Sequence, residues 1–209
     1  MNTVYFAKHP RLNFHEKLKE ELRSLIPPGK KVALKMHMGE PGNPYFIKPE
    51  FARQIVDSLK EIGVHPFIFD SLVIYPGPRN NVKGYLEAAA KHGYHEKEMG
   101  CPVLVSNDSI DVKREGYEFP FQVCAPLAKA DFVVVLSHVK GHICCGFGGA
   151  IKNLGMGAVS KATKKAIHDG GKPVYLSGCT LCGACVESCL LDNVRLDDVQ
   201  QRPYFDKNW

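Results

Sequence analysis

Four cysteines near the carboxyl end are the residues whose spacing most narrows the chemistry of this chain. Cys179, Cys182, Cys185 and Cys189 form a C-x2-C-x2-C-x3-C run. Three thiolates at two-residue gaps can surround one iron–sulfur cubane, and the fourth reaches a second cluster in two-cluster ferredoxins. A zinc site also accepts C-x2-C pairs, and a disulfide framework is a third interpretation. We predict that these four cysteines are metal ligands of a [4Fe-4S] cluster.

The run departs from the ferredoxin pattern, because Leu190 stands where a proline normally follows the fourth cysteine. A complete pair of clusters also needs a second cysteine run, and none precedes Trp209. Residues 193–197 and 202–206 have the pattern of the short hairpin that leads from one run to the next. We therefore expect the chain to stop where a second run would begin. A second run beyond that point would give two clusters instead of one. Otherwise the missing ligand comes from a partner or from Cys101, Cys124, Cys144 or Cys145.

Composition excludes several classes of protein. The chain has 209 residues, 44% hydrophobic and 23% charged, with a net charge of +5. Basic and acidic residues are interspersed without a basic stripe, so we expect no nucleic-acid partner. The longest apolar run, 132–136, cannot span a bilayer, and the N-terminus has too short an apolar stretch for a signal peptide. Eight cysteines without such a signal predict a cytoplasmic protein with no membrane partner.

Hydrophobic periodicity predicts an α/β fold, with a mostly parallel sheet flanked by helices. The predicted domains are 1–175, an α/β domain, and 176–209, an incomplete ferredoxin-like module. Residues 131–136 should form a central buried strand. Further strands are expected at 3–7, 32–36, 66–69, 102–106 and 111–113, and helices at 11–25, 50–62, 82–92 and 125–130.

A glycine-rich segment, 137–157, follows the predicted central strand, at the carboxyl end where open α/β sheets bind ligands. It lacks the spacing of a P-loop or of a dinucleotide fingerprint. The glycines either expose backbone amides to an anion or only permit a tight turn. Candidate cofactor-binding residues are His138, Gly146, Gly148, Gly149 and Asn153. Candidate catalytic residues, which we expect to join these polar residues at one edge of the sheet, are His142, Lys152 and His168.

The segment from Lys140 to Gly157, together with the cysteine run, resembles the uncharacterised iron–sulfur-centre proteins classified as domain of unknown function 362. The motifs that carry the resemblance are K-G-H, G-F-G-G-A, I-K-N-L-G and M-G, and the likeness extends over the entire chain. Members typically carry a ferredoxin-like segment with two cysteine runs. Because the family shares these cysteine runs but has no assigned reaction, the resemblance implies a cofactor more firmly than a reaction.

A more distant similarity is to the nickel-pincer lactate racemases. On that family's motif, Lys152 would tether the pincer, His168 would bind nickel and His142 would shuttle a proton. However, the loop 39–43 lacks the arginine that holds a substrate carboxylate in the racemases, and no second catalytic histidine matches. These departures argue against a nickel pincer.

Together these features predict an iron–sulfur protein with an electron-transfer role, served by a redox partner protein and coupled to a pocket for a small-molecule ligand. A non-redox, metal-dependent isomerase with a structural cluster and an iron–sulfur carrier are the alternatives. The sequence leaves open whether the chain is an enzyme, such as an oxidoreductase.

Overall fold

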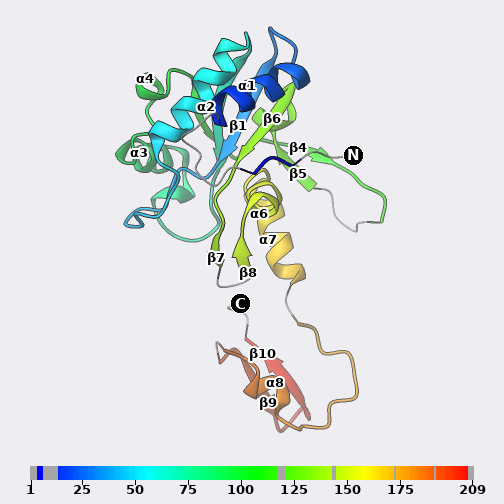
Figure 1. Ribbon diagram of the computed structural model, residues 1–209. Helices are drawn as coiled ribbons and strands as arrows, with labels where there is room; N and C mark the ends of the chain where they lie inside the picture. The colour runs from blue at the N-terminus through cyan, green and yellow to red at the C-terminus, as the bar shows by residue number, and fades with distance from the viewer. Residues whose placement is uncertain are drawn as a thin grey trace. The chain divides into compact units, whose positions relative to one another are not determined.

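The computed structural model describes residues 4–6, 14–116, 121–142, 145–171, 173–190 and 192–206. The chain separates into two compact units, Met1–Thr163 and Lys164–Trp209, each with its own architecture (Figure 1). Helix α7 (Lys161–Gly170) crosses the division, so the predicted boundary after residue 175 lies within the second unit.

The first unit contains a parallel sheet of four strands in the order β3-β2-β1-β6. These strands are β1 (Lys31–Met36), β2 (His65–Ser71), β3 (Val103–Ser106) and β6 (Phe132–Leu136). The helices are α1 (Phe14–Leu25), α2 (Pro49–Glu61), η1 (Pro78–Asn80), α3 (Val82–Lys91), α4 (Glu96–Met99), α5 (Ala125–Ala128) and α6 (Ala150–Gly155). No described helix is long and apolar enough to cross a membrane. The prediction of a parallel α/β sheet flanked by helices is confirmed.

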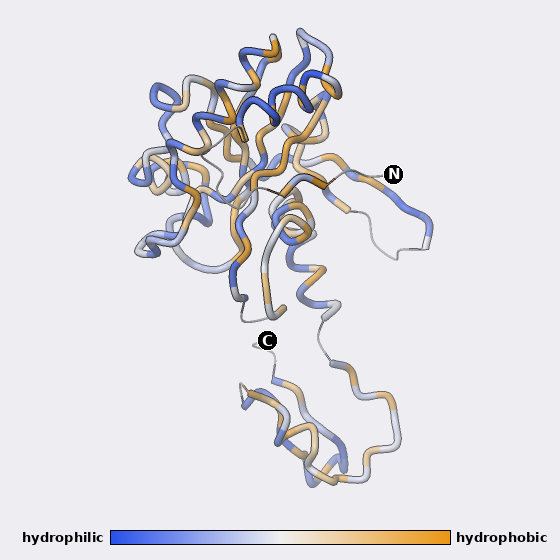
Figure 2. The backbone as a smooth tube through the Cα atoms, viewed as in Figure 1, coloured by the Kyte–Doolittle hydropathy of each residue, from blue (hydrophilic) through white to orange (hydrophobic). Residues whose placement is uncertain are grey.

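The strands form two hydrophobic faces because successive side chains point to opposite sides of a sheet. On one face, Val32, Leu34 and Met36 of β1 pack in the large core with residues of α1, α2 and α3. On the other, Ala33 belongs to a smaller cluster that also includes Cys124. Figure 2 shows the hydrophobic colour concentrated along these strands. A strand covered on both sides explains why 32–36 is a nearly continuous apolar run.

Two expectations about strands were wrong. Residues 4–6, within the predicted strand 3–7, are not in a strand, and Tyr5 is instead bonded through its hydroxyl to Glu21 of α1 at 2.6 Å. Strand β6 is not central, since it lies at the edge of the sheet, next to β1. Accordingly β6 is only partly buried, and Val133 is 40% exposed. An apolar run does not reveal which neighbours a strand will have.

Two antiparallel hairpins complete the first unit. They pair β4 (Ser109–Val112) with β5 (Phe121–Cys124) and β7 (Lys140–His142) with β8 (Gly146–Gly148). Part of the glycine-rich segment, including His142, is therefore a hairpin. Figure 1 shows α6 beside this hairpin.

The second unit, beyond α7, consists of α8 (Ala184–Glu187) and an antiparallel pair, β9 (Val194–Asp197) and β10 (Arg202–Phe205). The pair lies where the sequence predicted a hairpin after the cysteine run, so that prediction is confirmed. Among the described residues from 173 onward, Val194 is the only hydrophobic side chain that is buried. This segment therefore has little apolar core of its own.

Close packing of η1 against α3 depends on Gly84. A Cβ at this position would clash with the carbonyl oxygen of Pro78 and would lie 3.1 Å from the carbonyl carbon of the same residue. The Asn81 side chain caps α3 by accepting the backbone N–H of Gly84 at 2.9 Å. As a result, Arg79 is held in the interior with 2% exposure.

We predict that Gly84→Ala destabilises the protein by about 1–3 kcal/mol, because the new methyl group meets the backbone of η1. An alanine for glycine within a helix normally stabilises by about 0.5–1 kcal/mol. The matched control is Gly155→Ala in α6, where a Cβ meets nothing within 4 Å, and which should be neutral or stabilising. Urea unfolding of both variants measures the difference. A stabilised Gly84→Ala protein would contradict this account of the packing.

Candidate functional site

A buried ion pair lies at the carboxyl ends of the neighbouring strands β1 and β2. Lys35 and Asp70 are 0% and 3% exposed, and Lys35 Nζ donates to Asp70 Oδ1 at 2.9 Å. Isolated charges in such a position would cost several kcal/mol, so both need partners. We use the term carboxyl edge for the carboxyl ends of β1, β2 and β6 together with the polar side chains of other elements that bond there.

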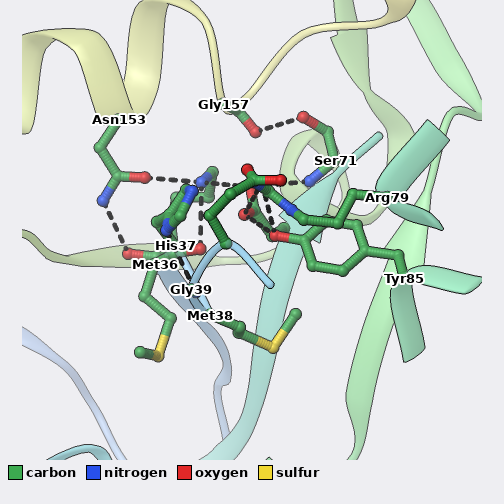
Figure 3. A network of polar contacts seen from close by, with 12 residues as sticks. Met36, His37, Met38, Gly39, Ser71, Arg79, Tyr85, Asn153 and Gly157 are labelled. Atoms are coloured by element: carbon green, nitrogen blue, oxygen red, sulfur yellow. Dashed lines mark hydrogen bonds and ion pairs between the residues drawn. The ribbon is translucent and has the colours of Figure 1, made fainter. Parts of the chain in front are cut away.

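Asn153 of α6 links the ion pair to β6. Its side-chain oxygen accepts a hydrogen bond from Lys35 Nζ at 2.6 Å, and its amide nitrogen donates to Ser137 Oγ at 2.8 Å and to the Leu136 carbonyl at 3.1 Å. The segment after α6 is also fixed, because Ser71 Oγ donates to the Gly157 carbonyl at 2.8 Å (Figure 3). The lysine thus joins three strands and α6 in one network.

Arg79 extends the network on the side of α3. Its guanidinium donates to the Tyr85 hydroxyl at 3.1 Å and lies 4.6 Å from the centre of the Tyr85 ring (Figure 3). The same guanidinium is paired with Glu40, and Tyr75 donates to that carboxylate at 2.7 Å. Tyr85 in turn donates to Asp70. Arg79 is therefore held by charge, by hydrogen bonds and by an aromatic face.

Electrostatics at the carboxyl edge favour an ionised aspartate and a neutral histidine. Burial alone would raise the pKa of the Asp70 carboxyl, but neighbouring positive charges, first that of Lys35, lower the pKa to about 2. His37 follows β1 directly, and burial and then the positive charge of Arg79 lower its pKa to about 3. Gly39 donates its backbone N–H to His37 Nδ1 at 3.1 Å. The neutral imidazole therefore carries its proton on Nε2.

Of the predicted cofactor-binding residues, Asn153 and His138 lie at this carboxyl edge. His138 is partly buried, and its Nε2 atom is buried without a hydrogen-bond partner. Burial lowers its pKa, as does the positive charge of Lys140. Gly146 and Gly148 are in strand β8, paired with β7, so these two residues are not in an open anion-binding loop. Gly149 precedes α6, which has only six residues.

The three predicted catalytic residues belong to three different elements, α6, β7 and α7. Lys152 is partly buried on α6, and its side chain runs past Gly148, where an added Cβ would lie 3.4 Å from Lys152 Cδ. His142 ends β7. His168 is on the part of α7 that belongs to the second unit. Cys144, between β7 and β8, lies outside the described residues.

The predicted metal ligands are in the second unit, and the backbone around them has the turns that bring amides to sulfur. Leu181 and Gly183 are left-handed, with φ of 57° and 80°. The backbone N–H of Leu181 donates to Cys179 Sγ at 3.4 Å, and that of Asn193 donates to Cys189 Sγ at 3.3 Å. Among the described residues, no three His, Cys, Asp or Glu side chains are grouped as a metal site.

The thiol of Cys182 is exposed, and its pKa is lowered by the backbone N–H of Ala184 and then by the Thr180 hydroxyl. A lowered pKa increases the fraction of thiolate, which is the form that binds metal. Together with the two N–H···S contacts, this environment fits a thiolate-bound metal group. Cys185, also exposed, has the spacing of a third ligand.

The other cysteines that could supply a ligand differ in access. Cys124 is fully buried and Cys101 is 7% exposed, both inside the first unit. Burial raises the pKa of the Cys101 thiol to about 11. These two thiols could reach a metal group only if the core opened, whereas Cys145 is exposed.

The family model for the domain of unknown function DUF362 matches residues 32–203, a range that includes the sheet except Lys31, the carboxyl edge and the four cysteines. The chain belongs to this family. No curated protein matches the chain. The DUF362 match thus supports the resemblance inferred from the glycine-rich motifs, and extends over residues of both units.

Several residues of the polar network around the carboxyl edge were not predicted from the sequence, namely Lys35, Glu40, Tyr75, Arg79 and Tyr85, and His37 was a candidate only by its residue type. The available signal was a lysine inside an apolar strand, K-V-A-L-K-M, because a buried strand rarely includes an unpaired charge. An aspartate at the carboxyl end of the next strand was its natural partner. Arg79 gave no comparable signal, since its burial depends on how η1 packs.

We predict that Lys35→Met destabilises the DUF362 protein by about 3–5 kcal/mol, since it leaves the Asp70 carboxylate buried without its ammonium partner. Urea unfolding measures this loss. Lys83→Met, at an exposed position of α3, is the matched control and should change stability by less than about 0.5 kcal/mol. Equal losses of stability in the two variants would show that the ion pair does not contribute to the free energy of unfolding beyond an exposed lysine.

We also predict that His37 makes stability depend on pH. The unfolded chain binds a proton at His37 near pH 6.5, whereas the folded protein does so only near pH 3. The contribution of His37 is therefore complete above about pH 6.5 and is lost as the pH falls towards 3, with a slope of at most about 1.4 kcal/mol per pH unit.

The measurement is urea unfolding of the wild type and of His37→Gln between about pH 7.5 and pH 4.5. The variant should lose less stability than the wild type over this range. His95→Gln, at an exposed position before α4, is the control and should follow the wild type. Parallel curves for the wild type and His37→Gln would refute the assigned pKa shift.

Proposed function

We propose that this DUF362 protein is an iron–sulfur protein with an electron-transfer role. Its second unit would hold a [4Fe-4S] cluster and exchange electrons with a redox partner protein. The reducible or oxidisable small molecule would bind at the carboxyl edge of the first unit. The observation that carries the proposal is the donation of backbone N–H groups to cysteine sulfur within a C-x2-C-x2-C-x3-C run.

Such hydrogen bonds support thiolate ligation for an electrostatic reason. An N–H dipole directed at sulfur stabilises negative charge there, and hydrogen bonds to the sulfurs are among the factors that set the potential of an iron–sulfur cluster. Leu181 supplies one of these N–H groups from a left-handed conformation, which costs a non-glycine residue about 1 kcal/mol or more. A bound group that gains from this geometry would offset that cost.

The scarcity of apolar core in the second unit supports the same proposal. Val194 is the only buried hydrophobic side chain among the described residues after 172, while Leu176, Leu190 and Val199 are 88%, 97% and 92% exposed. Segments this small usually need a metal or disulfides in addition to their hydrophobic contacts. Four thiolates around an inorganic group would provide that internal support.

Cys179, Cys182 and Cys185 would hold one cubane, and Cys189 would serve a second cluster or close the module. When bound, the cluster supplies one-electron redox chemistry. The backbone N–H groups of Leu181 and Asn193 would stabilise negative charge on the cysteine sulfurs, and Gly183 permits the turn into α8. The exposure of Cys182 and Cys185 leaves this part of the module accessible to a redox partner.

We predict that the protein purified without oxygen is brown and contains about four iron atoms and four acid-labile sulfides per cluster. Cys182→Ser should lose most of the iron, because serine is a poor substitute for a thiolate ligand. Cys145→Ser, which removes an exposed thiol of the first unit, is the matched control and should keep the full content. Iron and sulfide analysis with electron paramagnetic resonance of the reduced protein provides the measurement.

Two outcomes would contradict the proposal. Colourless protein with stoichiometric zinc would make the module a structural zinc site. Unchanged iron content after all four cysteines of the run are replaced by serine would place the iron elsewhere. Loss of iron from Cys145→Ser would instead identify Cys145 as a ligand and revise the ligand set.

A further inference from the structure

The strand order places a topological switch point between β1 and β6. The chain runs outward from β1 to β2 and β3 and then returns to β6 on the other side of β1. In open parallel sheets, ligands bind outside the carboxyl ends of the strands at such a point. Met36 and Leu136 are register partners, so His37 and Ser137 leave the two strands at the same level. His138 follows one residue later.

Two lysines next to this point share one side of the β7–β8 hairpin. Lys140 is opposite Gly148 in the hairpin register, and an added Cβ on Gly148 would lie 4.0 Å from Lys140 Cγ and 3.4 Å from Lys152 Cδ. The positive charge of Lys152 contributes to a lowered pKa of Lys140, after burial and the charge of Arg79. Because like charges repel, an anion placed near both ammonium groups would be stabilised.

The nearby acidic groups that the structure describes form no ion pair with these lysines. Asp70 is bonded to Lys35, and Glu40 is paired with Arg79. Neither Lys140 nor Lys152 has a hydrogen bond or an ion pair with any residue that the structure describes. The carboxyl edge therefore carries an excess of positive charge.

Hydrogen-bonding groups are present at the same place. His37 has its Nδ1 occupied by the Gly39 N–H, so its Nε2–H is a donor. His138 Nε2 is buried with no partner. An unsatisfied buried polar atom costs about 1–3 kcal/mol, and a ligand that bonds to it would recover that free energy. The two imidazoles follow the two strands that flank the switch point.

We propose that the carboxyl edge between β1 and β6 binds the oxyanion group of a small molecule, a carboxylate or a phosphate. Lys140 is its main counter-charge, with Lys152 contributing, and His37 and His138 hydrogen-bond to its oxygens. Arg79 and Lys35 do not contact the anion. They are positioning residues whose paired charges fix the first turn after β1 and add to the positive potential.

As a statement about the redox substrate, this inference rests on the proposed function, because it names the chemical class of the molecule bound at the carboxyl edge. As a binding site it depends on residues of the first unit alone. The full chain with all four run cysteines replaced by serine should therefore bind the same anions as the wild type, even if it holds no cluster.

The experiment is calorimetric titration of both full-length proteins with oxalate, inorganic phosphate and chloride at constant ionic strength. Oxalate or phosphate should bind saturably and chloride should not. Lys140→Gln should weaken the binding about tenfold, the loss expected for one charge-assisted hydrogen bond. Lys129→Gln, an exposed lysine just after α5, is the matched control of equal charge change and should stay within about twofold.

The preferred probe identifies the group, because oxalate reports a planar carboxylate site and phosphate a tetrahedral one. Ring nitrogen signals of His37 and His138 in nuclear magnetic resonance spectra should shift with saturation. Absence of saturable binding below about 20 mM would overturn the inference. So would an equal loss of affinity in Lys140→Gln and Lys129→Gln, which would indicate only a general charge effect. Binding that persists in the serine variant separates this result from failure of the cluster proposal.

Discussion

The ion pair of Lys35 and Asp70 is the constraint on which the architecture of the first unit depends. Both groups are withdrawn from water, and the free energy required is recovered only if every remaining donor and acceptor is also satisfied. Asn153 and Tyr85 supply those additional hydrogen bonds from α6 and α3. Helices α3 and α6, which are about 60 residues apart in the sequence, are therefore fixed around the same two charges.

Much of the fold could be predicted from the sequence because local periodicity reflects burial. The apolar stripe of α2 and the run in β1 lie within two residues of the predicted bounds. The order of the strands could not be predicted in the same way. Whether β6 is central or at the edge depends on pairing across about a hundred residues, which leaves no trace in the strand itself. For residues 4–6, the β-rich composition suggested a strand, but within the described part of the chain no strand pairs with them.

The candidate site was predicted only in part, for a physical reason. Asn153 and His138 stood in a motif of unusual composition, so their residue types drew attention. Arg79 looked like an ordinary solvent-exposed side chain, because its burial follows from tertiary packing and not from its neighbours in sequence, whereas Lys35 could have been recognised from its place inside an apolar strand. In the proposed anion site their role is indirect, since Lys35 is paired with Asp70 and Arg79 with Glu40. Buried atoms without a hydrogen-bond partner include His138 Nε2 and also Arg79 Nε.

The position of strand β6 at the edge of the sheet has a consequence for the chain while it folds. Its five residues, Phe132–Leu136, are all apolar, and no proline or lysine interrupts them. At the margin of a sheet, such a strand presents backbone groups to which the same strand of another molecule can add. Asp131, just before it, is the nearest gatekeeper, but its carboxylate is occupied by Lys30 and by the Lys31 amide. This topology therefore favours self-association of partly folded chains through β6, which a low protein concentration or a chaperone would counter.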